Sequence, residues 1–208
     1  MQFIYTFIIS FILIFLSELG DKTQILVLSF SAKNKTSSIL LGVALGTFLS
    51  HGIAIICGSN LSYINNDYFI YYLKLCTYFT FLIFGFLGFI KLKKSVSTSN
   101  VITDSNFRFI KFITSLSHNC IFLVASSIAI GEIGDKTFLS SLGLGIQYPL
   151  YKISLILGSI FGMVISNSFA IFFGKWISKN ISNNILEILS NIIFILFGVL
   201  GILSIVLP

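Results

Sequence analysis

The sequence predicts an all-α integral membrane protein with six transmembrane helices arranged as an inverted 3+3 repeat. Three observations lead to this prediction: the composition, six long apolar runs, and a pattern shared by the two halves of the chain. Of the 208 residues, 56% are hydrophobic and 10% are charged, and the mean hydropathy is +1.00. A soluble domain carries about a quarter charged residues. The composition therefore excludes a soluble enzyme, a nucleic-acid-binding domain and a secreted disulfide scaffold.

The predicted helices follow from apolar runs that are long enough to cross a bilayer, which takes about 20 residues. The breaks between the runs are short and polar, apart from a longer basic break at residues 91–111. We therefore expect a first three-helix unit at 1–92, a basic cytoplasmic linker at 93–111 and a second unit at 112–208. The apolar runs cover residues 3–31, 38–59, 69–90, 112–146, 153–174 and 185–207.

The positions of lysine and arginine predict the orientation of the chain. Nine of these residues fall in odd-numbered breaks and two are counted with even-numbered breaks (Lys152, and Lys74 near the start of the third run), while Lys22 and Lys136 lie deeper inside predicted spans. Because positive residues stay on the cytoplasmic side, we expect both termini outside the cytoplasm. Frequent Ile, Phe, Asn and Lys suggest an AT-rich genome. We therefore expect a bacterial inner membrane, with an organelle membrane as the alternative.

The two halves of the chain share a hexapeptide and a set of small residues. Glu-Leu-Gly-Asp-Lys-Thr at 18–23 recurs as Glu-Ile-Gly-Asp-Lys-Thr at 132–137. Three helices per unit is an odd number, so the second unit must enter the membrane from the opposite side. Such inverted repeats are typical of transporters that alternate access around a site at the repeat interface; the alternative is a duplication that only builds a stable bundle. The other matches pair Leu41, Gly42, Gly46, Ser50, Ala54, Gly58, Phe84, Gly85, Leu87 and Gly88 with Leu157, Gly158, Gly162, Ser166, Ala170, Gly174, Phe197, Gly198, Leu200 and Gly201.

Four of the seven acidic residues lie in the twin hexapeptides, inside apolar runs. One charge at the centre of a membrane helix costs about 2.5–3.5 kcal/mol, so these acids should converge on each other, on water or on an ion. On a continuous helix, Glu18 and Asp21 share a face with Lys22 beside them. The second motif repeats this arrangement, and across a two-fold axis the acidic faces would meet. The predicted ligands of a hard divalent cation are Glu18, Asp21, Glu132 and Asp135.

The summed charge of the two motifs suggests exchange of a divalent cation for protons. Two Glu, two Asp and two Lys sum to −2, which one divalent cation or two protons would neutralise. Thr23 and Thr137 would add hydroxyl groups, and a glycine in the middle of each motif would loosen the helix and free carbonyl oxygens. The competing interpretation, that each Glu simply pairs with the Lys of its own motif, leaves Asp21 and Asp135 unpaired.

Other polar residues in the spans are supporting candidates. His51 follows Ser50 in the second span, and the residues at the equivalent positions of the fifth span are Ser166 and Asn167. They would help to relay protons or bind the ion, or would only hydrogen-bond neighbouring helices. Gln24 would extend the site. The sequence has no catalytic triad or phosphate-binding loop, so we expect no enzyme, no ATP-driven pump and no permanently bound cofactor.

The twin Glu-x-Gly-Asp-Lys-Thr motif resembles that of the Gdt family of cation–proton exchangers. The resemblance covers nearly the whole chain, and both motifs match without substitution. Family members work in the Golgi and plastid or export manganese from bacteria. The resemblance implies exchange of Mn²⁺ or Ca²⁺ for H⁺, with the four motif acids as ligands and Lys22, Lys136, Thr23 and Thr137 in support.

The expected function is therefore a secondary antiporter that exports Mn²⁺, with Ca²⁺ as the second candidate, in exchange for protons by alternating access. The expected partners are the metal ion and membrane lipid, with no nucleic acid. Two alternatives remain: an exporter of another cationic solute, of the lysine-exporter type, and a non-transporting membrane assembly factor. The burial of four carboxylates in symmetric motifs favours the antiporter over the assembly factor.

Overall fold

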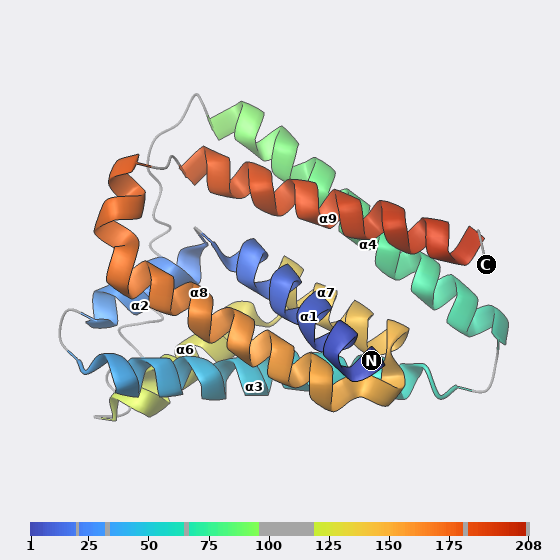
Figure 1. Cartoon of the computed structure of the whole chain (residues 1–208), viewed down its shortest axis with the longest axis horizontal. Helices are drawn as coiled ribbons and strands as arrows, with labels where there is room; N and C mark the ends of the chain where they lie inside the picture. Colours follow the sequence, from blue (N-terminus) through green and yellow to red (C-terminus); the bar gives the residue numbers. More distant parts are fainter. Residues whose placement is uncertain (20, 32–33, 65–66, 96–118, 181–182, 207–208) are drawn as a thin grey trace.

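The computed structural model describes residues 1–19, 21–31, 34–64, 67–95, 119–180 and 183–206, and these residues form helices and turns without a strand (Figure 1). The helices are α1 (Gln2–Glu18), α2 (Lys22–Ser31), α3 (Thr36–Leu61), α4 (Asp67–Ser95), α6 (Cys120–Glu132), α7 (Lys136–Gln147), α8 (Lys152–Asn180) and α9 (Asn183–Val206), with a 3-10 turn, η1 (Pro149–Tyr151), before α8.

Three of the described helical segments are long and apolar enough to cross a membrane: Thr36–Leu61, Tyr68–Ile90 and Pro149–Phe172. Shorter apolar segments lie at Gln2–Glu18, Cys120–Glu132 and Asn191–Ile205. The predicted start of the fourth span, residues 112–118, lies outside the described residues, as does most of the predicted linker. The helical fold and apolar segments agree with the predicted class, and the number of spans stays a prediction.

The first and fourth predicted spans are not continuous helices, which corrects the sequence analysis. Helix α1 ends at Glu18 and α2 begins at Lys22, while α6 ends at Glu132 and α7 begins at Lys136. The residue after each Glu is extended, and Gly134 has φ +84°, a left-handed conformation that glycine adopts without a steric penalty. A hydropathy average over about 20 residues cannot detect an interruption of three residues.

The two halves of the chain pack against each other, with corresponding contacts. Gly42 of α3 lies against the Ile121 carbonyl and Val124 of α6, and Gly158 of α8 lies against the Phe7 carbonyl and Ser10 of α1. The equivalent glycines one turn later, Gly46 and Gly162, repeat these contacts against Ala125 and Phe11. The order of the contacts shows that α1 runs parallel to α8, and α3 parallel to α6. Small residues allow this close approach of helix backbones.

Helices α4 and α9 form an antiparallel pair along one side of the bundle (Figure 1). Gly85 and Gly88 of α4 lie against Asn191, and Gly198 and Gly201 of α9 lie against Tyr78. The pair buries Tyr78, Phe81 and Phe194 as an aromatic cluster, separate from the larger core between the other helices.

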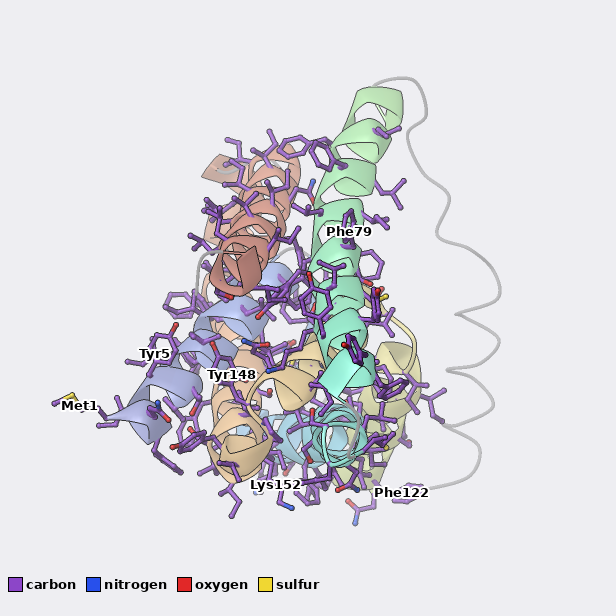
Figure 2. The ribbon with its side chains drawn as sticks, turned by 90° about the vertical axis from the view of Figure 1, so that its right-hand side faces the viewer. Met1, Tyr5, Phe79, Phe122, Tyr148 and Lys152 are labelled. Atoms are coloured by element: carbon purple, nitrogen blue, oxygen red, sulfur yellow. The ribbon has the colours of Figure 1, made fainter. Side chains whose placement is uncertain are left out.

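Large hydrophobic side chains cover the outside of the bundle. Phe79 of α4 and Phe122 of α6 point away from it (Figure 2) and are 52% and 59% exposed. An outer surface of this kind fits a lipid environment, whereas several serines, threonines and charged residues are fully buried inside. The polarity is thus concentrated within the bundle, where the candidate site lies.

Candidate functional site

The two helix breaks place one glutamate each inside the bundle. Glu18 is the last residue of α1 and Glu132 the last residue of α6, and their side chains are 0% and 1% exposed. The C-terminal end of a helix carries a partial negative charge. A carboxylate added at that end makes a strongly negative position, and interrupted membrane helices use such ends to bind cations.

A threonine holds each glutamate across its break. The Oγ1 of Thr23 donates to Oε2 of Glu18 at 3.0 Å, and the Oγ1 of Thr137 donates to Oε2 of Glu132 at 2.9 Å. Each bond links the end of one half-helix to the first turn of the next. The twin threonines therefore have the same local role. The Glu and Asp of each motif do not share a continuous helical face, which corrects the expectation from the sequence, because the helix ends between them.

The two motifs approach each other in the folded chain. The carboxylate of Glu18 lies within electrostatic range of Glu132, Asp21 and the Lys136 ammonium. Glu132 in turn interacts with Asp21, Asp135 and Lys136. Asp21 and Asp135 are only half-buried, so the glutamates form the deep part of the cluster and the aspartates its more accessible part.

Lys136 also contacts the α4–α9 pair. Its Nζ lies 5.8 Å from the centroid of the Phe194 ring, within the range of a cation–π interaction. The sequence analysis did not single out Phe194, because nothing in its local sequence distinguishes it from the other 22 phenylalanines of the chain. The side chain of Lys22, the counterpart of Lys136, lies outside the described residues.

His51 joins the second motif from helix α3. Its Nδ1 lies 2.7 Å from Oγ of Ser141 on α7, and its Nε2 lies 3.9 Å from Oε2 of Glu132. His51 and Ser141 are fully buried. Ser141 was missed by sequence reasoning, although it follows Thr137 by four residues and therefore shares its face of α7.

The remaining candidates differ in what they reach. Gln24 of α2 donates to the hydroxyl and carbonyl of Ser166 on α8, at 2.8 and 3.2 Å, and so connects the two halves. Asn167 donates to the carbonyl of Met163 on its own helix. Ser50 likewise donates within α3, to the Gly46 carbonyl. Ser50 thus makes a local helix contact, whereas Gln24 and Ser166 lie at a contact between helices.

Three polar atoms of these residues have no hydrogen-bond partner although they are buried: Oε1 of Glu18, Nε2 of His51 and Oδ1 of Asn167. Buried polar groups are nearly always paired, so unpaired ones need an explanation. A carboxylate oxygen, an imidazole nitrogen and an amide oxygen all bind metal ions. Among the described residues, however, no group of three or more His, Cys, Asp or Glu side chains is arranged to hold a metal ion. The acids approach each other without forming a closed cage.

A separate cavity of about 130 Å³ lies between α1, α4, α7 and α9. It is lined by Tyr5, Tyr78, Gln147 and Tyr148 among others, and by no residue of the two motifs. Tyr5 and Tyr148 are neighbours at the end of the bundle where the chain begins (Figure 2). The chemistry of the buried glutamates, rather than this cavity, marks the candidate site.

Comparison with known proteins identifies a family and a relative that this chain resembles. A family model described as "Divalent cation/proton antiporter GDT1" matches residues 6–95 and 120–206, which include both hexapeptides. A GDT1-like protein of Schizosaccharomyces pombe is 40% identical over 86 residues, which is 41% of this chain. The match spans about a third of that relative's length, 32%. No solved structure matches the chain.

Proposed function

Because this chain belongs to the GDT1 family of divalent cation/proton antiporters, we propose that it exports Mn²⁺ from the cytoplasm in exchange for protons, with Ca²⁺ as the second candidate cargo. The family is a family of transporters and not a class of enzymes. The chain is an integral membrane protein, and its site would bind the cation only transiently, as a transported substrate.

The observation that carries the proposal is the pair of buried glutamates at the helix breaks, within electrostatic range of each other. Two negative carboxylates in a nonpolar surrounding repel each other, and either a divalent cation or protons can remove that repulsion. Exchange follows if the two occupants exclude each other, since the arrival of one then promotes the release of the other. Asp21, Asp135 and the two threonines would complete the cation's oxygen ligands.

Alternating access would use the two halves as an inverted repeat, with units at 1–92 and 112–208 joined by the basic linker at 93–111. The parallel pairs α1–α8 and α3–α6 and the antiparallel pair α4–α9 support this proposal. Six alternating spans built from three helices and an inverted copy would have the same directions: the first and fifth spans parallel, the second and fourth parallel, and the third and sixth antiparallel. The broken helices at the interface are a recurrent feature of transporters built in this way.

The proposed orientation places both termini outside the cytoplasm, in a bacterial inner membrane or alternatively an organelle membrane. It rests on the excess of Lys and Arg in the odd-numbered breaks. In this orientation α1 runs inward and ends at Glu18, toward the cytoplasmic half of the membrane, and α6 runs outward and ends at Glu132, toward the outer half. Export would then carry the cation from the cytoplasmic side, nearer the first motif, to the outer side, nearer the second.

The test uses purified protein in liposomes with an imposed pH gradient, a trapped metal-sensitive dye and a trapped pH dye. We expect Mn²⁺ flux coupled to proton counterflow in the wild type, and loss of both fluxes in Glu18→Gln and Glu132→Gln. Glu187→Gln, which changes the remaining glutamate of the chain, should transport normally. Folded wild-type protein that moves neither Mn²⁺ nor Ca²⁺ would overturn the proposal and favour another cationic solute or an assembly role.

A further inference from the structure

We propose that His51 is a nitrogen ligand of the transported cation, and that it makes the site prefer a first-row transition ion such as Mn²⁺ over Ca²⁺. This inference rests on the proposed antiport function and names the residue that would select its substrate. It concerns a side chain outside the twin hexapeptides, on a different helix from either of them.

The first argument is that the Nε2 atom of His51 is buried and unpaired. The side chain is 0% exposed, and Nε2 has no hydrogen-bond partner. The Glu132 carboxylate lies close by, with its Oε2 3.9 Å from Nε2. That separation is too long for a hydrogen bond, so the two groups face each other without a direct bond.

The second argument is that the separation suits an ion between the two atoms. Zn²⁺, a first-row divalent ion, binds imidazole nitrogen and carboxylate oxygen at about 2.0–2.2 Å. Two such bonds span at most about 4.3 Å, which is slightly more than the observed separation. Small side-chain movements would bring nitrogen and oxygen to a bent arrangement around the ion. Glu18, whose Oε1 has no hydrogen-bond partner and which lies within electrostatic range of Glu132, would have to move closer to add a third ligand, because no three such side chains among the described residues are arranged to hold a metal ion.

The third argument is that Ser141 holds the imidazole in the required orientation. The Oγ of Ser141 lies 2.7 Å from Nδ1, which can therefore donate its proton to the hydroxyl and leave the Nε2 lone pair for the metal. Histidines that bind metals almost always use the second ring nitrogen in such a bond. Ser141 is accordingly a positioning residue.

The fourth argument comes from the equivalent position in the other half. The sequence repeat places Asn167 where the first half has His51, and Asn167 presents an unpaired, buried amide oxygen. An amide oxygen is a ligand of hard ions such as Ca²⁺. At this one position the first half offers a histidine nitrogen in place of an oxygen. Imidazole nitrogen binds transition ions, whereas Ca²⁺ sites use oxygen ligands.

The decisive measurement is pulsed electron paramagnetic resonance of Mn²⁺ bound to the purified full chain. An imidazole ligand produces a characteristic modulation of the electron spin echo by its nitrogen nucleus. We expect this signal in the wild type and in His118→Asn, in which His51 is the only histidine left. It should disappear in His51→Asn, the variant that copies the residue of the other half.

Selectivity provides the second measurement, by competition between Mn²⁺ and Ca²⁺ for the same protein. We expect His51→Asn to shift the ratio of the two dissociation constants toward Ca²⁺ by about tenfold or more, and Ser141→Ala to weaken Mn²⁺ binding by about 10–100-fold. An unchanged ratio in folded His51→Asn would overturn the proposed selectivity.

The outcomes separate this inference from the function on which it rests. Saturable Mn²⁺ binding without an imidazole signal in the wild type overturns the role of His51 and leaves the antiport proposal standing. Folded protein that binds Ca²⁺ but shows no saturable Mn²⁺ binding overturns the role of His51 alone, and folded protein that binds neither ion overturns both. An imidazole signal that survives in His51→Asn but not in His118→Asn assigns the ligand to His118 and also overturns the inference.

Discussion

Thr137 donates a hydrogen bond of 2.9 Å to Glu132, and this bond crosses the interruption between α6 and α7. The equivalent bond in the first half, from Thr23 to Glu18, measures 3.0 Å. The chain therefore secures the glutamate at the end of each short helix with a hydroxyl from the helix that follows. The first prediction tests this arrangement directly.

Thr137→Val removes the hydroxyl while nearly preserving the shape of the side chain. The loss leaves one carboxylate oxygen without its donor, so we expect cation affinity to fall by about tenfold, the equivalent of about 1.4 kcal/mol. Thr137→Ser keeps the hydroxyl and should retain most of the affinity. The measurement is equilibrium Mn²⁺ binding, and equal affinities for the valine and serine variants would contradict the proposed role of the bond.

Gly134→Ala tests the backbone of the second break. Gly134 has φ +84°, and an added Cβ would meet no atom within 4 Å, so any effect must come from the backbone conformation and not from crowding. An alanine in this region costs about 1–2 kcal/mol, and we expect lower thermal stability and slower exchange. Gly134→Asn should be milder, because asparagine tolerates left-handed φ.

Gly131→Ala is the matched control for that experiment, since Gly131 lies in α6 and also has open space around it. A helical glycine replaced by alanine is normally neutral or stabilising. Unfolding of all three variants in detergent, followed by circular dichroism, gives the comparison. Equal behaviour of Gly131→Ala and Gly134→Ala would mean that the left-handed residue is dispensable.

Gly42→Ala and Gly158→Ala should destabilise the protein by similar amounts, because the two glycines occupy corresponding contacts. A Cβ at Gly42 would lie 2.7 Å from Cβ of Val124, and one at Gly158 would crowd Phe7 and Ser10. Overpacking of this kind costs about 1–3 kcal/mol. Gly52→Ala, whose Cβ would make ordinary contacts of 3.6 Å or more, serves as the control. A large difference between the first two variants would argue against equivalent packing.

Gln24→Leu removes the hydrogen bonds to Ser166 that link α2 to α8. Because the lost partner leaves buried groups unpaired, we expect a loss of about 1–3 kcal/mol in the free energy of unfolding. Exchange in liposomes should slow as well, since the link lies next to the first motif. Normal flux in a folded Gln24→Leu variant would limit the bond to a packing role.

The sequence predicted correctly those features that depend on many residues together, such as the location of the helices. Apolar runs predicted helices in the right parts of the chain, and the repeated hexapeptides predicted that Glu18 and Glu132 would approach each other. The interruption after each glutamate was not predicted as a helix end, because it involves so few residues that the surrounding apolar ones dominate the average. Only the central glycine hinted at it, and Gly134 does adopt the left-handed conformation.

Contacts made by single side chains could not be predicted from the sequence. The bond between His51 and Ser141 depends on how α3 lies on α7, and neither residue's neighbours specify its partner. The placement of Lys136 over Phe194 depends in the same way on how α7 approaches the α4–α9 pair. Repeat spacing gave the equivalence of His51 and Asn167, whereas the unpaired atoms of both residues became apparent only in the folded chain.

The parallel contact between α1 and α8 has a consequence for synthesis of the protein. Ser10 hydrogen-bonds to Ser159, a partner 149 residues later in the chain. At a translation rate of about 5–20 residues per second, α1 waits on the order of ten seconds before that partner emerges. During this interval Thr6 and Ser10 lack their bonds to α8 and must be shielded by the insertion machinery or by transient neighbours. Truncated nascent chains that end before α8 should therefore crosslink to that machinery through α1, and longer chains should release it.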